Sequence, residues 1–332
     1  MPAPPKQPSE RRKPGLPSIH EGREQRLAGR WSVVTGRAWL TIAVGLIASL
    51  LIYRIVSGRE IEGRRSALLG KQRAVDATVG KEWLPLRDRL EKFVIKSSGP
   101  EGADIIQPEA KAWINHVATG VYLRIRLADA MSPEAIRTTA RDSARDAFTG
   151  CLLRTENAAL ARGEVDAGVF PDQPWNLRQA YAATRILSPE WVSEVSTADD
   201  SLRLRVFEQQ YDKAEREEIP KAIEIIKRAD FFLLVLDESA DDPKDEKPLW
   251  TDGGVDTAEE AIQLAPHWAR VFVLDLQKDK EILRLRRRAE GGFVFAGGKP
   301  VTDEETLDAM KRQVNNCALA QEIRGSVLPP PP

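Results

Sequence analysis

The stretch FFLLVLDE, residues 231–238, decides the fold of this 332-residue chain. Its apolar run is too short for a helix and is typical of a strand that is buried on both faces. We therefore expect a central strand of a β-sheet here.

Four further segments of the chain have strand patterns. Residues 121–127, VYLRIRL, alternate apolar and polar side chains, which is typical of a strand with one wet face. Residues 270–276 and 281–288 flank the turn QKDK and predict a hairpin, and GGFVFAGG at 291–298 predicts a further short strand. The alternation indicates an antiparallel or mixed sheet.

Helix signals separate the predicted strands. Ser132 and Ser188 are each followed by Pro and Glu, the pattern of an N-cap with a first-turn proline and acid. A long helix is predicted over about 199–228, in which Pro220 forms a kink or a new start, and Thr302 begins a capping-box pattern for the last helix. Because strands and helices do not alternate regularly, we predict an α+β fold with an antiparallel or mixed sheet and helices packed on one face.

An apolar stretch, RAWLTIAVGLIASLLIYRIV, occupies residues 37–56. Sixteen residues between Arg37 and Arg54 carry no charge, and with its flanks the segment reaches the ~20 residues that a membrane-spanning helix needs. A helix buried in a soluble domain would show a polar stripe, and a cleaved signal peptide would have a shorter leading tail. We predict one uncleaved transmembrane helix at residues 38–57.

The other segments complete the predicted domain organisation. Residues 1–30 form a basic, proline-rich tail and residues 326–332 a proline tail, and both compositions predict disorder. Residues 59–98 repeat apolar side chains at intervals of seven and predict a helical juxtamembrane segment. Residues 99–325 are the predicted α+β domain.

Charge is distributed unevenly along the chain, whose net charge is −1. Residues 1–58 carry nine basic and three acidic side chains, which leaves an acidic body. The basic tail suits an anionic lipid surface, whereas the acidic body gives no reason to expect a nucleic-acid partner. Basic residues flank both ends of the apolar stretch, but Glu60 and Glu62 dilute the second flank, which favours a cytoplasmic N-terminus and an extracytoplasmic domain at the cell membrane.

The two cysteines of the chain are Cys151 and Cys317. In an oxidising compartment they are candidates for one disulfide that closes a very long loop. The alternative is two buried, reduced thiols, since free cysteine is among the most buried residue types.

Three predicted strands end at or near an acid: Asp129, Asp237 and Asp275. If these strands were neighbours that run in the same direction, their carboxylates would converge and could hold Mg²⁺ for phosphoryl chemistry. The competing explanation is that Asp is favoured wherever a strand gives way to a turn.

Arginine recurs on the polar faces of two predicted strands, as Arg124 and Arg126 in one and as Arg284 and Arg286 in the other. If the strands were adjacent, these side chains would form a patch that grips phosphates or carboxylates. The alternative is a solvated face whose arginines pair with the abundant acids.

These observations favour a non-enzymatic binding or scaffolding role in the cell envelope. The alternatives are a metal-dependent hydrolase that uses the strand-end carboxylates, and a regulatory domain tethered to the cytoplasmic face of the membrane. No His or Cys pair has metal-ligand spacing and no phosphate-binding loop is present, so no cofactor is expected. The expected partners are the lipid bilayer, an envelope protein or anionic polymer, and a second copy of the chain through the membrane or juxtamembrane helix.

Overall fold

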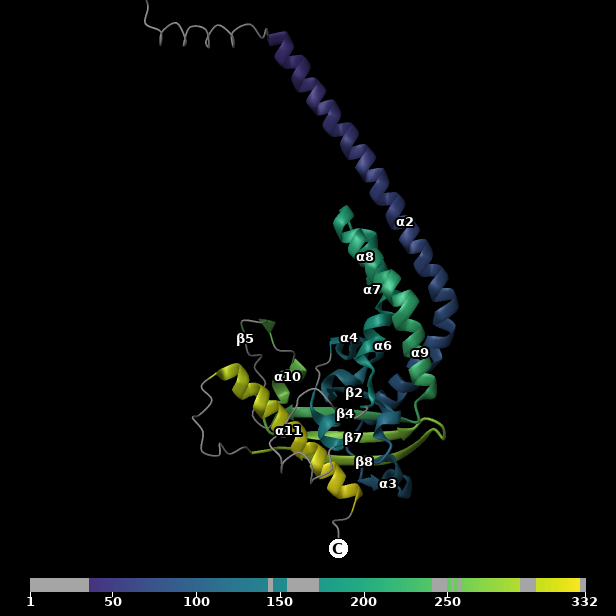
Figure 1. Ribbon diagram of the computed structural model, residues 1–332, viewed down its shortest axis with the longest axis vertical. Helices are drawn as coiled ribbons and strands as arrows, with labels where there is room; N and C mark the ends of the chain where they lie inside the picture. The colour runs from purple at the N-terminus through teal and green to yellow at the C-terminus, as the bar shows by residue number, and fades with distance from the viewer. Residues whose placement is uncertain are drawn as a thin grey trace, which may run out of the picture. The chain divides into compact units, whose positions relative to one another are not determined.

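The computed structural model describes residues 36–142, 146–153, 173–240, 250–251, 254–255, 258–292 and 303–328 (Figure 1). The chain divides into two compact units, residues 1–64 and residues 65–332, and each is described by itself. Helix α2, Gly36–Ser97, contributes residues to both. The predicted tail at 1–30 and nearly all of the predicted short strand at 291–298 lie outside the described residues.

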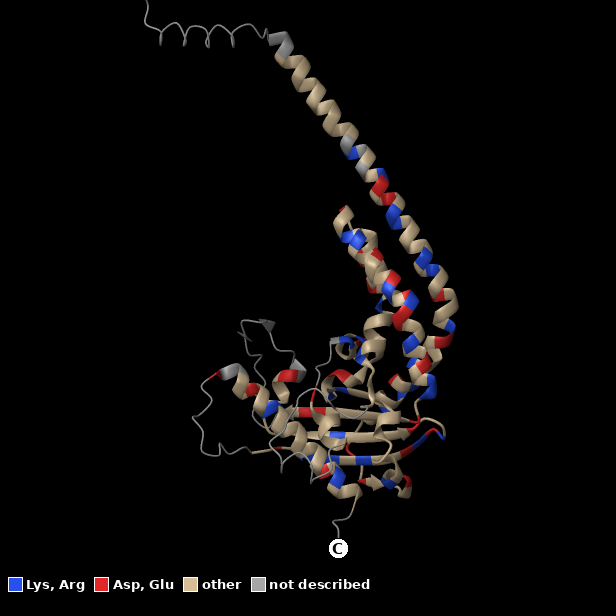
Figure 2. Ribbon diagram, in the orientation of Figure 1, with Lys and Arg blue, Asp and Glu red and all other residues tan. Residues whose placement is uncertain are grey.

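In the first unit, residues 36–64 are helical. Ten large apolar side chains between Trp39 and Val56 are each more than half exposed. Figure 2 shows a long run near the start of α2 without acidic or basic residues, which agrees with the uncharged sequence between Arg37 and Arg54. Among the residues that the structure describes, no helix has both the length and the apolar character to cross a membrane. The transmembrane helix at residues 38–57 stays a prediction.

The second unit contains a six-stranded mixed sheet with the strand order β1-β8-β7-β4-β2-β3. Strand β2 runs parallel to β3 and β4, whereas β4, β7, β8 and β1 pair in antiparallel fashion. This arrangement confirms the α+β prediction with a mixed sheet. The strands are β1 (Ile105–Ile106), β2 (Val121–Arg126), β3 (Trp175–Asn176), β4 (Phe231–Ala240), β7 (His267–Asp275) and β8 (Lys280–Ala289), and β5 (Trp250–Thr251) pairs with β6 (Gly254–Val255) in a separate two-stranded sheet.

Strand β4 is the central strand that the apolar run predicted, and its side chains from 232 to 237 are buried. The hairpin of β7 and β8 is also confirmed. The prediction of a wet face on β2 is wrong, because its side chains from 121 to 125 are all buried.

Helices cover both faces of the sheet, and not one face as predicted. One face carries Leu233 and Val271, which belong to a buried core formed with helices α3 (Pro108–Trp113), α5 (Phe148–Leu153) and α11 (Glu304–Val327). On the other face, Phe93 of α2 packs edge-on against Phe232 and Phe272. Tyr122 and Arg124 of β2 are therefore enclosed, whereas Arg126 at the end of the strand is partly exposed.

The helix signals of the sequence are largely confirmed. Ser188 caps α7 (Pro189–Thr197), since its hydroxyl accepts a hydrogen bond from the backbone N–H of Trp191 at 3.2 Å. The helix predicted over 199–228 is divided into α8, a π-helical turn and α9, with Pro220 in the first turn of α9, where its missing N–H costs least. The remaining helices are η1 (Val117–Thr119), η2 (Leu127–Met131), α4 (Pro133–Asp142), α6 (Arg178–Ala183), η3 (Thr184–Leu187), α8 (Ser201–Lys213), the π turn η4 (Ala214–Glu218), α9 (Ile219–Arg228) and α10 (Ala258–Ile262).

Candidate functional site

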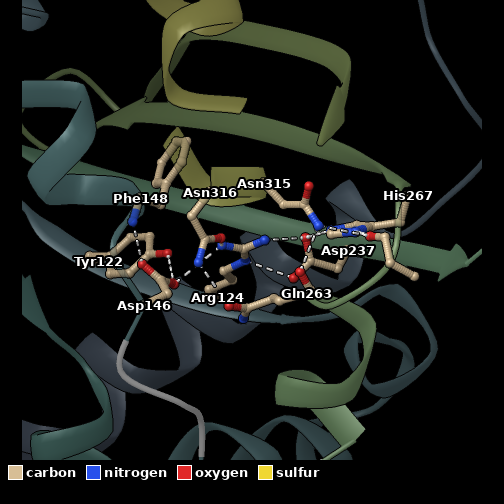
Figure 3. Close-up of polar contacts among 10 residues, drawn as sticks. Tyr122, Arg124, Asp146, Phe148, Asp237, Gln263, His267, Asn315 and Asn316 are labelled. Atoms are coloured by element: carbon tan, nitrogen blue, oxygen red, sulfur yellow. Dashed lines mark hydrogen bonds and ion pairs between the residues drawn. The ribbon is translucent and has the colours of Figure 1, made fainter. Parts of the chain in front are cut away.

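A cluster of polar side chains lies buried between the sheet and α11 (Figure 3). At its centre is Arg124 on β2, which is 4% exposed. The Nε and Nη2 atoms of Arg124 donate hydrogen bonds to the two carboxylate oxygens of Asp237 on β4, at 2.7 and 2.9 Å. Arg126 is the residue of β2 that pairs with Asp237 in the sheet. Arg124 precedes Arg126 by two residues and points to the same face, and its long side chain reaches along the strand to Asp237. Arg124 and Asp237, on two neighbouring parallel strands, thus form a buried, bidentate ion pair.

His267, at the start of β7, contacts the same carboxylate. Its Nε2 atom lies 3.1 Å from Oδ1 of Asp237, and its Nδ1 atom lies 2.8 Å from the carbonyl oxygen of Ala265. Burial raises the pKa of Asp237, but the charges of Arg124 and His267 outweigh it and hold the pKa below its ordinary value. Both ring nitrogens of His267 face oxygen atoms, one of the Asp237 carboxylate and one of the Ala265 carbonyl.

A second carboxylate, Asp146, completes the charge balance of the cluster. It lies 3.5 Å from Nη1 of Arg124 and accepts hydrogen bonds from the Tyr122 hydroxyl at 2.5 Å and from the backbone N–H of Phe148 at 3.0 Å. Burial raises the pKa of Asp146, and the charge of Arg124 opposes that rise. Burial also raises the pKa of Tyr122 well above its usual range, so this hydroxyl keeps its proton and acts as a donor.

Helix α11 joins the cluster through two adjacent amides. The side-chain oxygen of Asn316 accepts a hydrogen bond from Nη1 of Arg124, and its nitrogen donates to the side chain of Gln263 at 3.0 Å. Asn315 donates to the backbone oxygen of Gln263 at 2.9 Å. The cluster therefore links three strands, the segment before β7 and α11, and its members satisfy one another. Such a network specifies how the elements pack, because an unpaired member would pay its full desolvation cost.

A cavity of about 300 Å³ adjoins the cluster at Asp237. That volume is at the lower end of the range for small-molecule sites. Its polar wall includes Arg126, which donates to Asp129 at 2.7 Å. The rest of the wall is mostly small or apolar, and comprises Ser98, Leu127, Ala128, Met131, Ser239 and Ile262.

The three strand-end acids do not converge. Asp129 pairs with Arg126 and Asp237 pairs with Arg124, while Asp275 accepts hydrogen bonds from two backbone N–H groups of the β7–β8 turn. Because β7 is antiparallel to β4, Asp275 lies opposite the first residue of β4, at the other end from Asp237. Among the described residues, no three His, Cys, Asp or Glu side chains are placed to hold a metal ion. The condition for a metal site at these three acids, that their strands end at the same edge of the sheet, is therefore not met.

The four predicted arginines do not form one patch. Strands β7 and β4 separate β8 from β2, and the register places Arg284 and Arg286 on the opposite sheet face from Arg124 and Arg126. Arg284 pairs with Glu281, and Arg286 pairs with a carboxylate of β4. The patch required β2 and β8 to be neighbours in the sheet, and they are not. The order of strands in a sheet cannot be read from the sequence of either strand alone.

The structure joins Cys151 on α5 to Cys317 on α11 as a disulfide, with the two Cα atoms 5.0 Å apart. Sequence reasoning missed His267, Asp146 and Asn316 as members of the buried cluster. Their only sequence signal was polarity next to apolar segments, and that signal is shared by many surface residues.

No protein-family model, no curated protein and no solved structure matches the chain. Arguments about its function therefore rest on its own residues and their geometry.

Proposed function

We propose that the chain is a membrane-anchored protein whose α+β domain lies outside the cytoplasm and has a non-enzymatic binding or scaffolding role in the cell envelope. The pairing of Cys151 with Cys317, 166 residues apart in sequence, carries this proposal. Disulfides persist in oxidising compartments and are rare in the cytosol, where thiols are kept reduced. A structural disulfide between the two cysteines of the chain favours an extracytoplasmic location.

The exposed apolar segment of α2 supports the membrane part of the proposal. Its ten large apolar side chains lie on all sides of the helix, since they include the neighbours Trp39 and Leu40 and again Leu50, Leu51 and Ile52. A protein partner typically covers one stripe of a helix, whereas lipid surrounds it completely. Exposure of apolar surface to water costs about 25 cal/mol per Å², so this segment favours a lipid environment. Basic residues precede it at Arg30 and Arg37, on the side where the anionic headgroups of the cytoplasmic leaflet would attract them.

The buried cluster supports a non-enzymatic role. Arg124, Asp237, His267 and Asp146 use their hydrogen-bonding capacity on one another and on α11, which favours structural specification over acid–base chemistry. A binding role then belongs to the surface of the second unit, and its proposed partner is an envelope protein or an anionic polymer.

Reporter fusions at the carboxyl terminus test the topology. One reporter is active only outside the cytoplasm and its counterpart only inside, and both are fused to the full chain. We expect activity from the outside reporter alone. Activity from the inside reporter alone would overturn the proposal and favour a membrane-tethered regulatory domain in the cytoplasm.

Two further measurements separate the parts of the proposal. The full chain should sediment with membranes and be released by detergent but not by high salt, whereas a variant that lacks residues 38–57 should stay in the soluble fraction.

A thiol-reactive polymer applied to the denatured, unreduced protein should add no mass, and the Cys151→Ser variant should gain one label as the control. Two labels on the wild-type protein would contradict the oxidised state.

A further inference from the structure

We propose that the second unit has a binding site for a small oxyanion, a phosphate or a carboxylate group, in a pocket between the carboxyl end of α2 and strands β7 and β8. The pocket has a volume of about 60 Å³. It is separate from the buried cluster, because Arg284 and Arg286 lie on the opposite face of the sheet. The charged residues of its wall are Lys96, Glu101, Arg270, Glu281, Arg284 and Arg286.

Cations outnumber carboxylates in the wall of this pocket. Four cations, Lys96, Arg270, Arg284 and Arg286, face three carboxylates, namely Glu101 and Glu281 of the lining and Glu238, which pairs with Arg270 and Arg286. Within the described parts of the chain, the hydrogen bonds leave three cationic donors without an acceptor, namely Nζ of Lys96, Nη2 of Arg270 and Nη1 of Arg284. An oxyanion in the pocket would accept from these donors.

The arginines are held in place before any ligand binds. Arg270 donates to Glu238 at 2.7 Å and to the carbonyl oxygen of Gly99 at 2.6 Å. Arg284 forms two hydrogen bonds with Glu281, and the guanidinium of Arg286 stacks 4.3 Å from the centre of the Trp268 ring. Fixed guanidinium groups lower the entropic cost of binding and suit the planar oxygens of a carboxylate or phosphate.

Gly102 fits the same function. A Cβ atom at this position would make the flexible end of Arg284 shift, so the glycine lets Nη1 of Arg284 keep its present place beside the pocket. The pocket volume suits one small oxyanion group better than a larger ligand, since small-molecule sites have volumes from about 300 Å³ upward. The source of that group is a free anion or the phosphate of a lipid headgroup.

Calorimetric titration of the full chain in a neutral detergent tests the site. The probes are inorganic phosphate, acetate and glycerol 3-phosphate, each compared with chloride at equal ionic strength. We expect millimolar binding that weakens as salt is added. Tighter binding of glycerol 3-phosphate than of phosphate would identify a headgroup as the source, and equal or weaker binding would identify a free anion. Heat no larger than that of chloride for all three probes would overturn the proposal.

Matched variants locate the binding. Lys96→Gln removes an exposed cation that has no ion-pair partner among the described residues, and should weaken phosphate binding about fivefold. Lys81→Gln makes the same charge change ~22 Å earlier along α2 and should leave the affinity unchanged. Equal effects of the two variants would show that only net charge matters and would overturn the site.

A third variant should act in the opposite direction. Glu101 is about half exposed and lies 3.7 Å from Arg286, so Glu101→Gln removes a competing carboxylate at little structural cost. We expect phosphate to bind about threefold more tightly to this variant. Weaker binding would contradict an anion site. The inference does not depend on membrane anchoring, so the topology experiment and this titration can fail separately.

Discussion

Arg124 is a full positive charge in the core, and its partner Asp237 is equally buried. Replacement of Arg124 by Ala should lower the free energy of unfolding by about 3–5 kcal/mol, because Asp237 would keep a buried charge with only His267 to oppose it. Urea unfolding at neutral pH measures the loss. Arg126→Ala is the matched control on the same strand and face; its ion pair with Asp129 is part-exposed and should contribute at most ~1 kcal/mol. Equal losses in the two variants would contradict the central role of Arg124.

Asp146 should give the unfolding free energy a recognisable pH dependence. Its pKa is raised by burial, so the folded state binds this proton more tightly than the unfolded state. The group therefore favours folding at low pH, and this contribution is lost as the pH rises from about 4 through the raised pKa. Asp237 has a lowered pKa and acts oppositely, because its contribution is present above its ordinary pKa and is lost as the pH falls.

Replacement of Asp146 by Asn removes the contribution of Asp146 to stability at low pH and leaves that of Asp237. We expect the stability of this variant to rise more steeply with pH above about 4 than that of the wild-type protein. Urea unfolding at a series of pH values measures the slope. Asp279→Asn, in the exposed turn between β7 and β8, is the control and should keep the wild-type slope. A shallower slope in the Asp146→Asn variant would contradict the raised pKa.

At the scale of elements, α5 and α11 are joined twice. The disulfide links Cys151 to Cys317, and Arg124 lies between Asp146, which precedes α5, and Asn316 of α11. The covalent link and the polar cluster therefore fix the same two helices over the same sheet face. We expect either link alone to hold α11 near its place, so that the losses of stability on removing the two links are partly redundant.

Replacement of both cysteines by Ser should lower the free energy of unfolding by about 2–5 kcal/mol. The loop that the bond closes spans 166 residues, for which the chain-entropy model gives about 5 kcal/mol. Urea unfolding with and without reductant measures the effect. Reductant should destabilise the wild-type protein by a similar amount and leave the double variant unchanged. A wild-type protein insensitive to reductant would show that the bond does not stabilise the fold.

At the scale of the whole molecule, residues 65–332 have the contacts of a compact unit of their own. We expect a chain that begins at residue 65 to unfold cooperatively, with a Tm within a few degrees of the full chain's. Thermal unfolding followed by circular dichroism measures this. Loss of the cooperative transition would show that residues 1–64 are needed for folding of the second unit.

The fold could be predicted from the sequence where the pattern is local. The apolar run of β4 and the turn of the β7–β8 hairpin are local patterns, as are the Ser-Pro-Glu signals before α4 and α7, and each predicted its element. The candidate cluster could not be predicted in this way. Arg124 lies on a strand that alternates apolar and polar side chains, and this pattern predicts a solvent-exposed face. The face is buried because α11 covers it, and α11 begins about 180 residues after Arg124 in the sequence.

The sequence by itself determined the element types, the α+β class and the apolar segment of residues 37–56, because these depend on side-chain periodicity within a few turns or one strand. Only the tertiary structure decided which strands are neighbours and in which direction they run. That order separated Asp275 from Asp237 and Arg284 from Arg124, and the docking of α5 and α11 on one sheet face brought Cys151 to Cys317. The physical reason is that strand order and helix docking depend on the burial of whole faces, to which residues far apart in sequence contribute together.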